Sequence, residues 1–105
     1  MHKAPGKKIK DICLQLGEPY TIKVIDRENM IYRDLGNGFD IEVSGLDNQK
    51  KSINASIYVW QTKNFIHTVE TIHDINSIIE LKDTLGYLAI KYLNISISNP
   101  DRIQN

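Results

Sequence analysis

Hydrophobic and polar residues alternate along the chain between Met30 and Trp60, in the way that is typical of antiparallel strands with one buried face. Alternation over residues 30–35, 39–44 and 53–60 predicts three strands of a meander. The sequence Gly36-Asn37-Gly38 separates the first two, and an Asn-Gly pair between alternating segments is a strong signal for a tight hairpin turn. The fold prediction is built on this stretch.

Elements on both sides of this stretch complete the predicted fold. Residues 20–25 and 65–72 predict two further strands, and the pattern leaves open which way the side chains of 65–72 face. Apolar residues at helical spacing predict a short helix over residues 7–16, with Cys13 in the core, and a long helix that begins after Asp74 or Ser77 and ends near residue 93. Gly86 within that helix suggests close packing on the sheet. Residues 95–98 alternate briefly and suggest a short edge strand. The expected fold is therefore α+β: a five-stranded antiparallel meander with both helices on one face.

Two registers are possible for the predicted hairpin with a two-residue loop. With Asn37-Gly38 as the loop, Tyr32 opposes Val43 and Arg33 opposes Glu42; with Gly36-Asn37, they oppose Ile41 and Asp40. Both registers place the same side chains on the core face: Met30, Tyr32, Phe39, Ile41 and Val43. A three-residue loop would break this assignment.

The opposite face of the predicted sheet is the candidate binding surface. Tyr58 and Trp60 alternate with the aliphatic residues of their strand, so they point away from the core. Aromatic side chains among charges of both signs are typical of protein–protein interfaces. An equally favoured reading is that a terminal segment covers Tyr58 and Trp60 or that they only strengthen cross-strand pairing. The candidate partner-binding residues are Lys23, Arg33, Asp40, Glu42, Tyr58 and Trp60.

Composition and charge indicate one small globular domain without a global charge bias. The chain has 105 residues, 41% of them hydrophobic, and 13 basic residues balance 13 acidic ones. We expect a flexible basic arm over residues 1–6, a domain over residues 7–98 and a flexible tail over residues 99–105. A single cysteine and the absence of a signal-like or membrane-spanning apolar run predict a cytoplasmic protein, with no membrane contact. A monomer or weak dimer is expected.

Recognisable catalytic or metal-binding motifs are missing from the sequence. His2, His67, His73 and Cys13 lie at spacings that match no zinc signature, so no metal and no cofactor are expected. The sequence contains no glycine-framed serine, phosphate-binding loop or kinase signature. Three carboxylates flank the Gly36–Gly38 turn, but solvated strand positions explain them better than acid–base catalysis does; they are Asp34, Asp40 and Glu42. We therefore expect a protein that is not an enzyme.

The block IYRDLGNGFDIEVSGLDNQKKSINASIYVW, followed by SIIELKDTL, resembles small, mostly uncharacterised proteins encoded on mobile genetic elements of Gram-positive bacteria. The resemblance spans roughly residues 31–92. Some small proteins of that setting resemble type II anti-CRISPR inhibitors, which bind an RNA-guided nuclease and block DNA binding or cleavage. The resemblance thus implies an inhibitory protein whose partner is a CRISPR effector nuclease, contacted at a protein surface such as its recognition lobe.

Two other functions fit the sequence. Lysines near the start of the chain suit a nucleic-acid-binding accessory protein of a mobile element, in which the phosphate backbone would contact Lys3, Lys7, Lys8 and Lys10. The order of helix, meander and helix is loosely similar to that of a double-stranded-RNA-binding domain, although the basic motif of that family is missing at residues 77–80. An immunity or adaptor protein is the third possibility.

Overall fold

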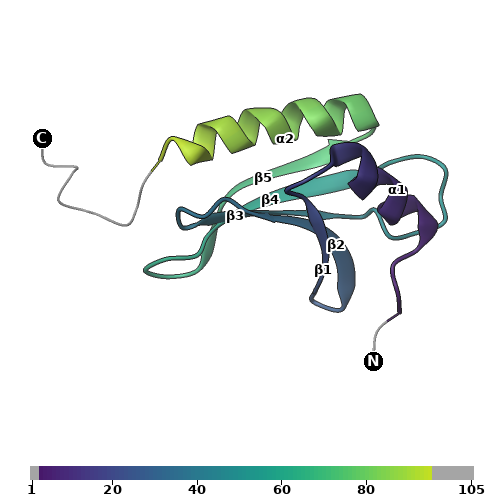
Figure 1. The fold of residues 1–105 in the computed structure, drawn as a ribbon, viewed down its shortest axis with the longest axis horizontal. Coiled ribbons are helices and arrows are strands. Elements are labelled where there is room, and N and C mark those ends of the chain that lie inside the picture. Colours follow the sequence, from purple (N-terminus) through teal and green to yellow (C-terminus); the bar gives the residue numbers. More distant parts are fainter. Residues whose placement is uncertain (1–2, 96–105) are drawn as a thin grey trace, which may run out of the picture.

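The computed structural model describes residues 3–95 and contains the predicted five-stranded antiparallel sheet with two helices (Figure 1). The strands follow one another in sheet order as in the chain. The elements are α1 (Lys7–Leu16), β1 (Thr21–Ile25), β2 (Glu28–Asp34), β3 (Phe39–Ser44), β4 (Ala55–Gln61), β5 (His67–Ile75) and α2 (Ile78–Leu93). The α+β prediction is confirmed, while the predicted edge strand over 95–98 lies largely outside the described residues, as do the tail over 99–105 and His2.

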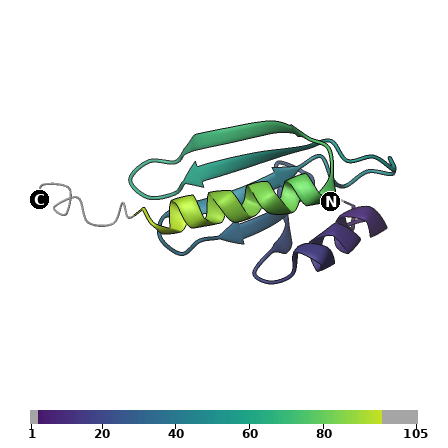
Figure 2. The same ribbon diagram turned by 90° about the horizontal axis from the view of Figure 1, so that it is seen from above.

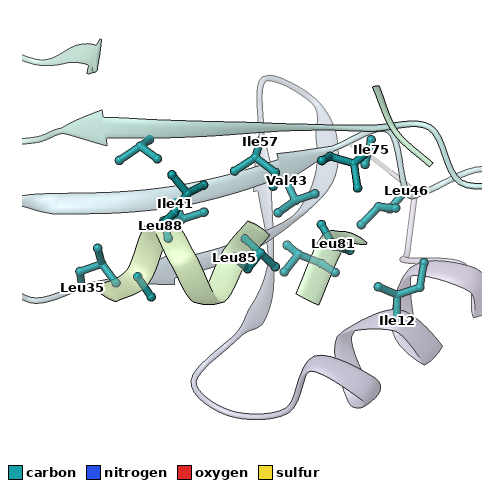
Figure 3. Packing of buried hydrophobic residues seen from close by; sticks show 14 of the residues in the cluster. Ile12, Leu35, Ile41, Val43, Leu46, Ile57, Ile75, Leu81, Leu85 and Leu88 are labelled. Atoms are coloured by element: carbon teal, nitrogen blue, oxygen red, sulfur yellow. The ribbon is translucent and has the colours of Figure 1, made fainter. Parts of the chain in front are cut away.

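Helix α2 runs along one face of the sheet, and α1 lies beside it near β1 and β2 (Figures 1 and 2). Alternate residues of the central strands point to this helix and are fully buried, among them Ile41, Val43 and Ile57. The buried stripe of α2 faces them with Leu81, Leu85 and Leu88 (Figure 3). Full burial of each such side chain stabilises the fold by about 1.5–3 kcal/mol. The strand and helix periodicities therefore meet in one core.

The start of α2 is fixed by capping. Ser77 is the N-cap, and its hydroxyl accepts a hydrogen bond from the Glu80 amide at 3.1 Å. The Glu80 carboxylate accepts in return from the Asn76 amide at 2.9 Å. These bonds satisfy two backbone donors that a helix start leaves free. Of the two predicted N-caps, Ser77 is the one that caps the helix.

Both predicted registers of the β2–β3 hairpin are wrong, because the loop has three residues. The Leu35 amide donates to the Phe39 carbonyl at 3.0 Å, and Tyr32 lies opposite Glu42. Gly36 and Gly38 adopt positive φ values of 80° and 97°, which glycine tolerates. The Asn37 side chain instead donates to two carbonyls at the end of α2, those of Tyr92 at 2.7 Å and Ile95 at 2.9 Å. Asn37 therefore ties the turn to the helix.

The three-residue loop shifts the faces of β2 by one residue relative to the prediction. Arg33 lies opposite the buried Ile41 and therefore belongs to the helix side, whereas Tyr32 lies on the other side. Met30 also lies on the side away from the helix, where it is buried without joining the core cluster. The predicted positions of Met30, Tyr32 and Arg33 are thus corrected, while Phe39, Ile41 and Val43 face the core as predicted.

Three further expectations are corrected, two by the burial of side chains and one by the length of a strand. Gly86 is exposed on the outer side of α2, where an added Cβ would meet no atom within 4 Å, so it does not mark close packing. Cys13 is only half-buried at the edge of the core, because it lies beside a surface groove between α1 and β1. Strand β5 runs to Ile75, beyond the predicted end at residue 72.

Candidate protein-binding face of the sheet

The face of the sheet away from α2 carries no helix among residues 3–95 (Figure 1). Cross-strand pairs bring its side chains together, with Glu42 opposite both Tyr32 and Tyr58, and Asp40 opposite Trp60. We call this surface the open face and define it by Lys23, Met30, Tyr32, Asp40, Glu42, Tyr58 and Trp60.

Each carboxylate of the open face accepts a hydrogen bond from an aromatic side chain. The Tyr32 hydroxyl donates to Asp40 Oδ2 at 3.0 Å, and the Trp60 indole N–H donates to Glu42 Oε1 at 3.0 Å. These bonds fix the ring orientations, while the rings remain half-buried rather than enclosed. The face therefore presents ordered aromatic surface, and beneath it the buried Asp40 Oδ1 atom has no hydrogen-bond partner among the described residues.

Burial and mutual repulsion raise the pKa of the carboxyl groups on this face. Partial desolvation raises the pKa of Asp40, and the nearby charge of Asp34 raises it further, although the Tyr32 hydrogen bond acts in the opposite sense. Desolvation likewise raises the pKa of Glu42, with repulsion from Asp40 and Asp26 adding to it. Burial and the bond to Asp40 also raise the pKa of Tyr32. A cation placed near these groups would stabilise their charged forms.

One basic residue accompanies these acids. The Lys23 ammonium lies 4.2 Å from the centre of the Tyr32 ring, in a cation–π contact, and it lowers the pKa of both Asp40 and Glu42 slightly against the main trend. Because the pKa of both carboxyl groups is still raised, Lys23 does not neutralise the face.

A concavity of about 290 Å³ lies on the open face near the β1–β2 turn. Two acids at that turn, Asp26 and Glu28, are among its lining residues. The register explains this position, since Glu28 is two and four residues from Met30 and Tyr32 on the same side of β2. The cavity is lined by Asp26, Glu28, Met30, Glu42, Ser44, Tyr58 and Trp60.

A serine and a histidine meet at the β5 side of the open face. Ser56 Oγ and His73 Nδ1 are 2.8 Å apart, and the His73 ring stands edge-on to Tyr58, with 6.1 Å between ring centres. Among the described residues His73 donates no hydrogen bond to a carboxylate, so the pair lacks the third, orienting group of a catalytic triad. The contact extends the aromatic surface of Tyr58.

Five of the six predicted partner-binding residues lie together on the open face: Lys23, Asp40, Glu42, Tyr58 and Trp60. The sixth, Arg33, does not, because the corrected register turns it to the helix side. There its guanidinium carbon is 5.4 Å from the centre of the Tyr20 ring, and its Nε is buried without a hydrogen-bond partner in the described structure. Periodicity identified the aromatic residues and acids of β3 and β4, but Tyr32 required the true register.

Residues 3–6, the described part of the N-terminal segment, lie away from Tyr58 and Trp60. The Lys3 carbonyl accepts a hydrogen bond from the Asn29 side chain at 3.0 Å, and the Gly6 amide donates to Asp47 at 3.0 Å. Asn29 is on the helix side of β2, opposite in direction to Met30. The arm is thus attached to the domain at these two residues, and its flexibility stays a prediction.

The predicted nucleic-acid-binding lysines separate into two places. Lys3, Lys7 and Lys8 line one groove, whereas Lys10 borders the apolar groove beside Cys13. Burial raises the pKa of the Cys13 thiol, whose sulfur lies 3.6 Å from the Tyr20 carbonyl oxygen, and this disfavours the reactive thiolate.

Residues 3–95 contain no cluster of three or more His, Cys, Asp or Glu side chains arranged to hold a metal ion. Within the same residues, neither helix has the length and apolar character needed to cross a membrane. Comparisons of the chain with protein-family models, with curated proteins and with solved structures find no significant match.

Proposed function

We propose that this protein is a non-enzymatic inhibitor that binds a protein partner through the open face of its sheet. The observation that carries the proposal is the pairing of aromatic donors with partly desolvated carboxylates, Tyr32 with Asp40 and Trp60 with Glu42. Such groups supply the anchoring area and the directional acceptors that dominate protein–protein binding.

The charges of the open face favour a basic partner surface. Five acids lie on or beside it against two basic residues, Lys23 on the face and Arg27 in the adjoining β1–β2 turn, although the chain as a whole has no net charge. Ionisation of Asp40 and Glu42 is disfavoured in the free protein. An arginine or lysine of the partner would form ion pairs with these carboxylates and so stabilise their charged forms. The five acids are Asp26, Glu28, Asp34, Asp40 and Glu42.

The specific partner that we propose is a type II RNA-guided nuclease, which the resemblance over residues 31–92 implies. Nucleases of this class hold nucleic acid in positively charged channels, and the acidic and aromatic open face suits a surface of that charge. The inhibitor would act in the cytoplasm, as a monomer or weak dimer, by blocking DNA binding or cleavage. The charge of the open face would favour one orientation of docking.

A plasmid-cleavage assay with purified nuclease and guide RNA tests this function. We expect the protein to inhibit cutting, and the double variant Asp40→Asn, Glu42→Gln to need a concentration about tenfold or more higher for half-inhibition. These changes keep an oxygen that accepts from Tyr32 and Trp60 but remove both charges. A matched control, Glu18→Gln with Asp83→Asn, removes two exposed acids outside the open face and should inhibit like the unmodified protein.

Undiminished cutting at excess protein would refute the nuclease as partner. Equal inhibition by the open-face variant and the control variant would refute the open face as the binding surface.

A further inference from the structure

A second charged surface lies between the N-terminal segment and the loop that joins β3 to β4. It is a groove of about 530 Å³, and it shares no lining residue with the cavity of the open face. Lysines from segments about 40 residues apart in the chain meet here, which the sequence did not reveal. We call it the lysine groove and define it by Lys3, Lys7, Lys8, Lys50 and Lys51.

Hydrogen bonds hold the two walls of the groove together. The Lys8 ammonium donates to Asn48 Oδ1 and to the Ser52 carbonyl, both at 2.7 Å. Across the same junction, the Gly6 amide donates to Asp47 at 3.0 Å. The loop is ordered in turn by a bond of 2.9 Å from the Asn48 side chain to the Gly45 carbonyl. The lysines of the groove therefore lie on two segments, residues 3–8 and the β3–β4 loop, that are hydrogen-bonded to each other.

The two acids of the groove are already engaged. Asp11 forms an ion pair with Lys7, one turn earlier on α1. Asp47 accepts from the Asn29 side chain at 2.8 Å and from the Gly6 amide, and these bonds lower its pKa. Lys3, Lys50 and Lys51 are exposed, and no ion pair of theirs occurs among residues 3–95. The groove thus carries an excess of positive charge.

The placement of the lysines is unfavourable for the free protein. The first turn of α1 contains no acidic residue, and its N-cap, Gly6, offers no side-chain acceptor. Lysines at the positive end of a helix oppose its dipole, and like charges gathered in one groove repel one another. Basic residues gathered at such a cost are the pattern expected of a site that binds an anion.

We propose that the lysine groove binds the phosphate backbone of a nucleic acid without reading its sequence. Ammonium groups on flexible stems act as point charges for phosphates. The described residues that line the groove include no aromatic side chain on which bases would stack, which favours contact with the backbone alone. An acidic protein fits less well, because the lining also lacks the large apolar anchor that protein interfaces use.

Fluorescence anisotropy with labelled nucleic acid tests the proposal, using a single-stranded RNA and a DNA duplex of equal length and unrelated sequences. We expect affinity to fall with salt, with a slope of about 0.7 per phosphate contact for the single strand and about 0.9 for the duplex. Comparing the two slopes and affinities distinguishes which form the groove prefers.

The double variant Lys50→Gln, Lys51→Gln is the diagnostic one, because both side chains are exposed. Losing two contacts should reduce the slope by about 1.4–1.8 and weaken binding by about 25- to 60-fold at about 0.1 M salt. The matched control, Lys63→Gln with Lys82→Gln, removes two exposed lysines elsewhere and should bind within about twofold of the unmodified protein. Circular dichroism establishes that both variants are folded.

An affinity that does not change with salt concentration, or equal affinities of the two double variants, would overturn the proposal. Displacement of the RNA by poly-glutamate as readily as by unlabelled RNA would also overturn it and would identify an acidic protein as the better ligand. The proposal is independent of the inhibitor function: Asp40→Asn, Glu42→Gln should leave RNA binding intact, so either idea can fail alone.

Discussion

The two faces of the sheet are formed by the same strands, but they shift the pKa of their carboxyl groups in opposite directions. On the helix side, Glu70 accepts from the Lys91 ammonium at 2.9 Å and the Tyr92 hydroxyl at 2.7 Å, and these bonds lower its pKa. On the open face, desolvation raises the pKa of Asp40 and Glu42 although each accepts an aromatic hydrogen bond. One face therefore gains stability from its acid, whereas the other holds its acids at a cost.

Alternate residues of each strand differ in burial, and we infer that they also differ in role. Ile41 and Val43 of β3 are fully buried under α2, while Asp40 and Glu42, which alternate with them, stay half-exposed. Partly desolvated carboxylates that do not contribute to the core are typical of a binding surface. Changes on the helix side should therefore alter stability, and changes on the open face should alter binding.

The largest effect is expected in the core. Replacing Leu85, which is 1% exposed and faces the sheet, by Ala should lower the free energy of unfolding by about 2–5 kcal/mol, because it leaves a cavity under the helix. Urea denaturation followed by circular dichroism measures this. A loss below about 1 kcal/mol would contradict the packing of α2 described above.

A smaller effect is expected for the acid on the helix side. Glu70→Gln removes the charged acceptor of the Tyr92 hydroxyl and should cost about 1 kcal/mol at neutral pH, discounted for exposure. Because the folded-state pKa of Glu70 is lowered, its contribution is present above the ordinary value of 4.5 and is lost as the pH falls through the folded-state pKa. Unfolding curves at several pH values should show the two proteins converging in acid. Parallel curves would count against the Glu70 contacts.

The hairpin register shows how far local pattern reaches. Alternation correctly predicted the five strands and the facing of β3 and β4, and helical spacing predicted both helices, because those features depend on neighbouring residues. Local pattern could not predict the three-residue loop, in which Asn37 donates to two carbonyls at the end of α2, more than fifty residues away. The register that goes with this loop places Tyr32 on the open face and Arg33 on the helix side.

The lysine groove was beyond sequence reasoning for the same reason. The N-terminal lysines were visible as a cluster, but Lys50 and Lys51 join them only because Lys8 bonds to Asn48 and Ser52 in the folded chain. Asp26 and Glu28 similarly joined the site only once the pairing of β1 with β2 was known.

Helix α2 offers a stabilising substitution that tests its outer side. Gly86→Ala should raise the free energy of unfolding by about 0.5–1 kcal/mol, because glycine weakens a helix interior and an added Cβ would meet nothing within 4 Å. Thermal unfolding provides the measurement. Destabilisation would mean that Gly86 is in contact with another part of the protein.

The smallest effect on stability is expected on the open face. Asp40→Asn with Glu42→Gln should raise the free energy of unfolding at pH 7 by up to about 0.5 kcal/mol. Because the folded-state pKa of each acid is raised, the unmodified protein loses this stability as the pH rises from the ordinary values of 3.8 and 4.5 through the folded-state pKa values. The difference between the two proteins should therefore vanish in acid and grow toward neutral pH, as for Glu70→Gln but with the opposite sign, because here the variant is the more stable protein. A gap that widens in acid would show the sign to be wrong.

The most direct test of the open face compares binding and stability in a single variant, Trp60→Ala. We expect half-inhibition of the nuclease to require about 30-fold more protein, as for the loss of an aromatic anchor, while the free energy of unfolding falls less than in Leu85→Ala. Tyr87→Ala removes an aromatic side chain that is 59% exposed on α2 and should inhibit like the unmodified protein. Inhibition by Trp60→Ala that equals that of Tyr87→Ala would contradict the assignment of the open face as the binding surface.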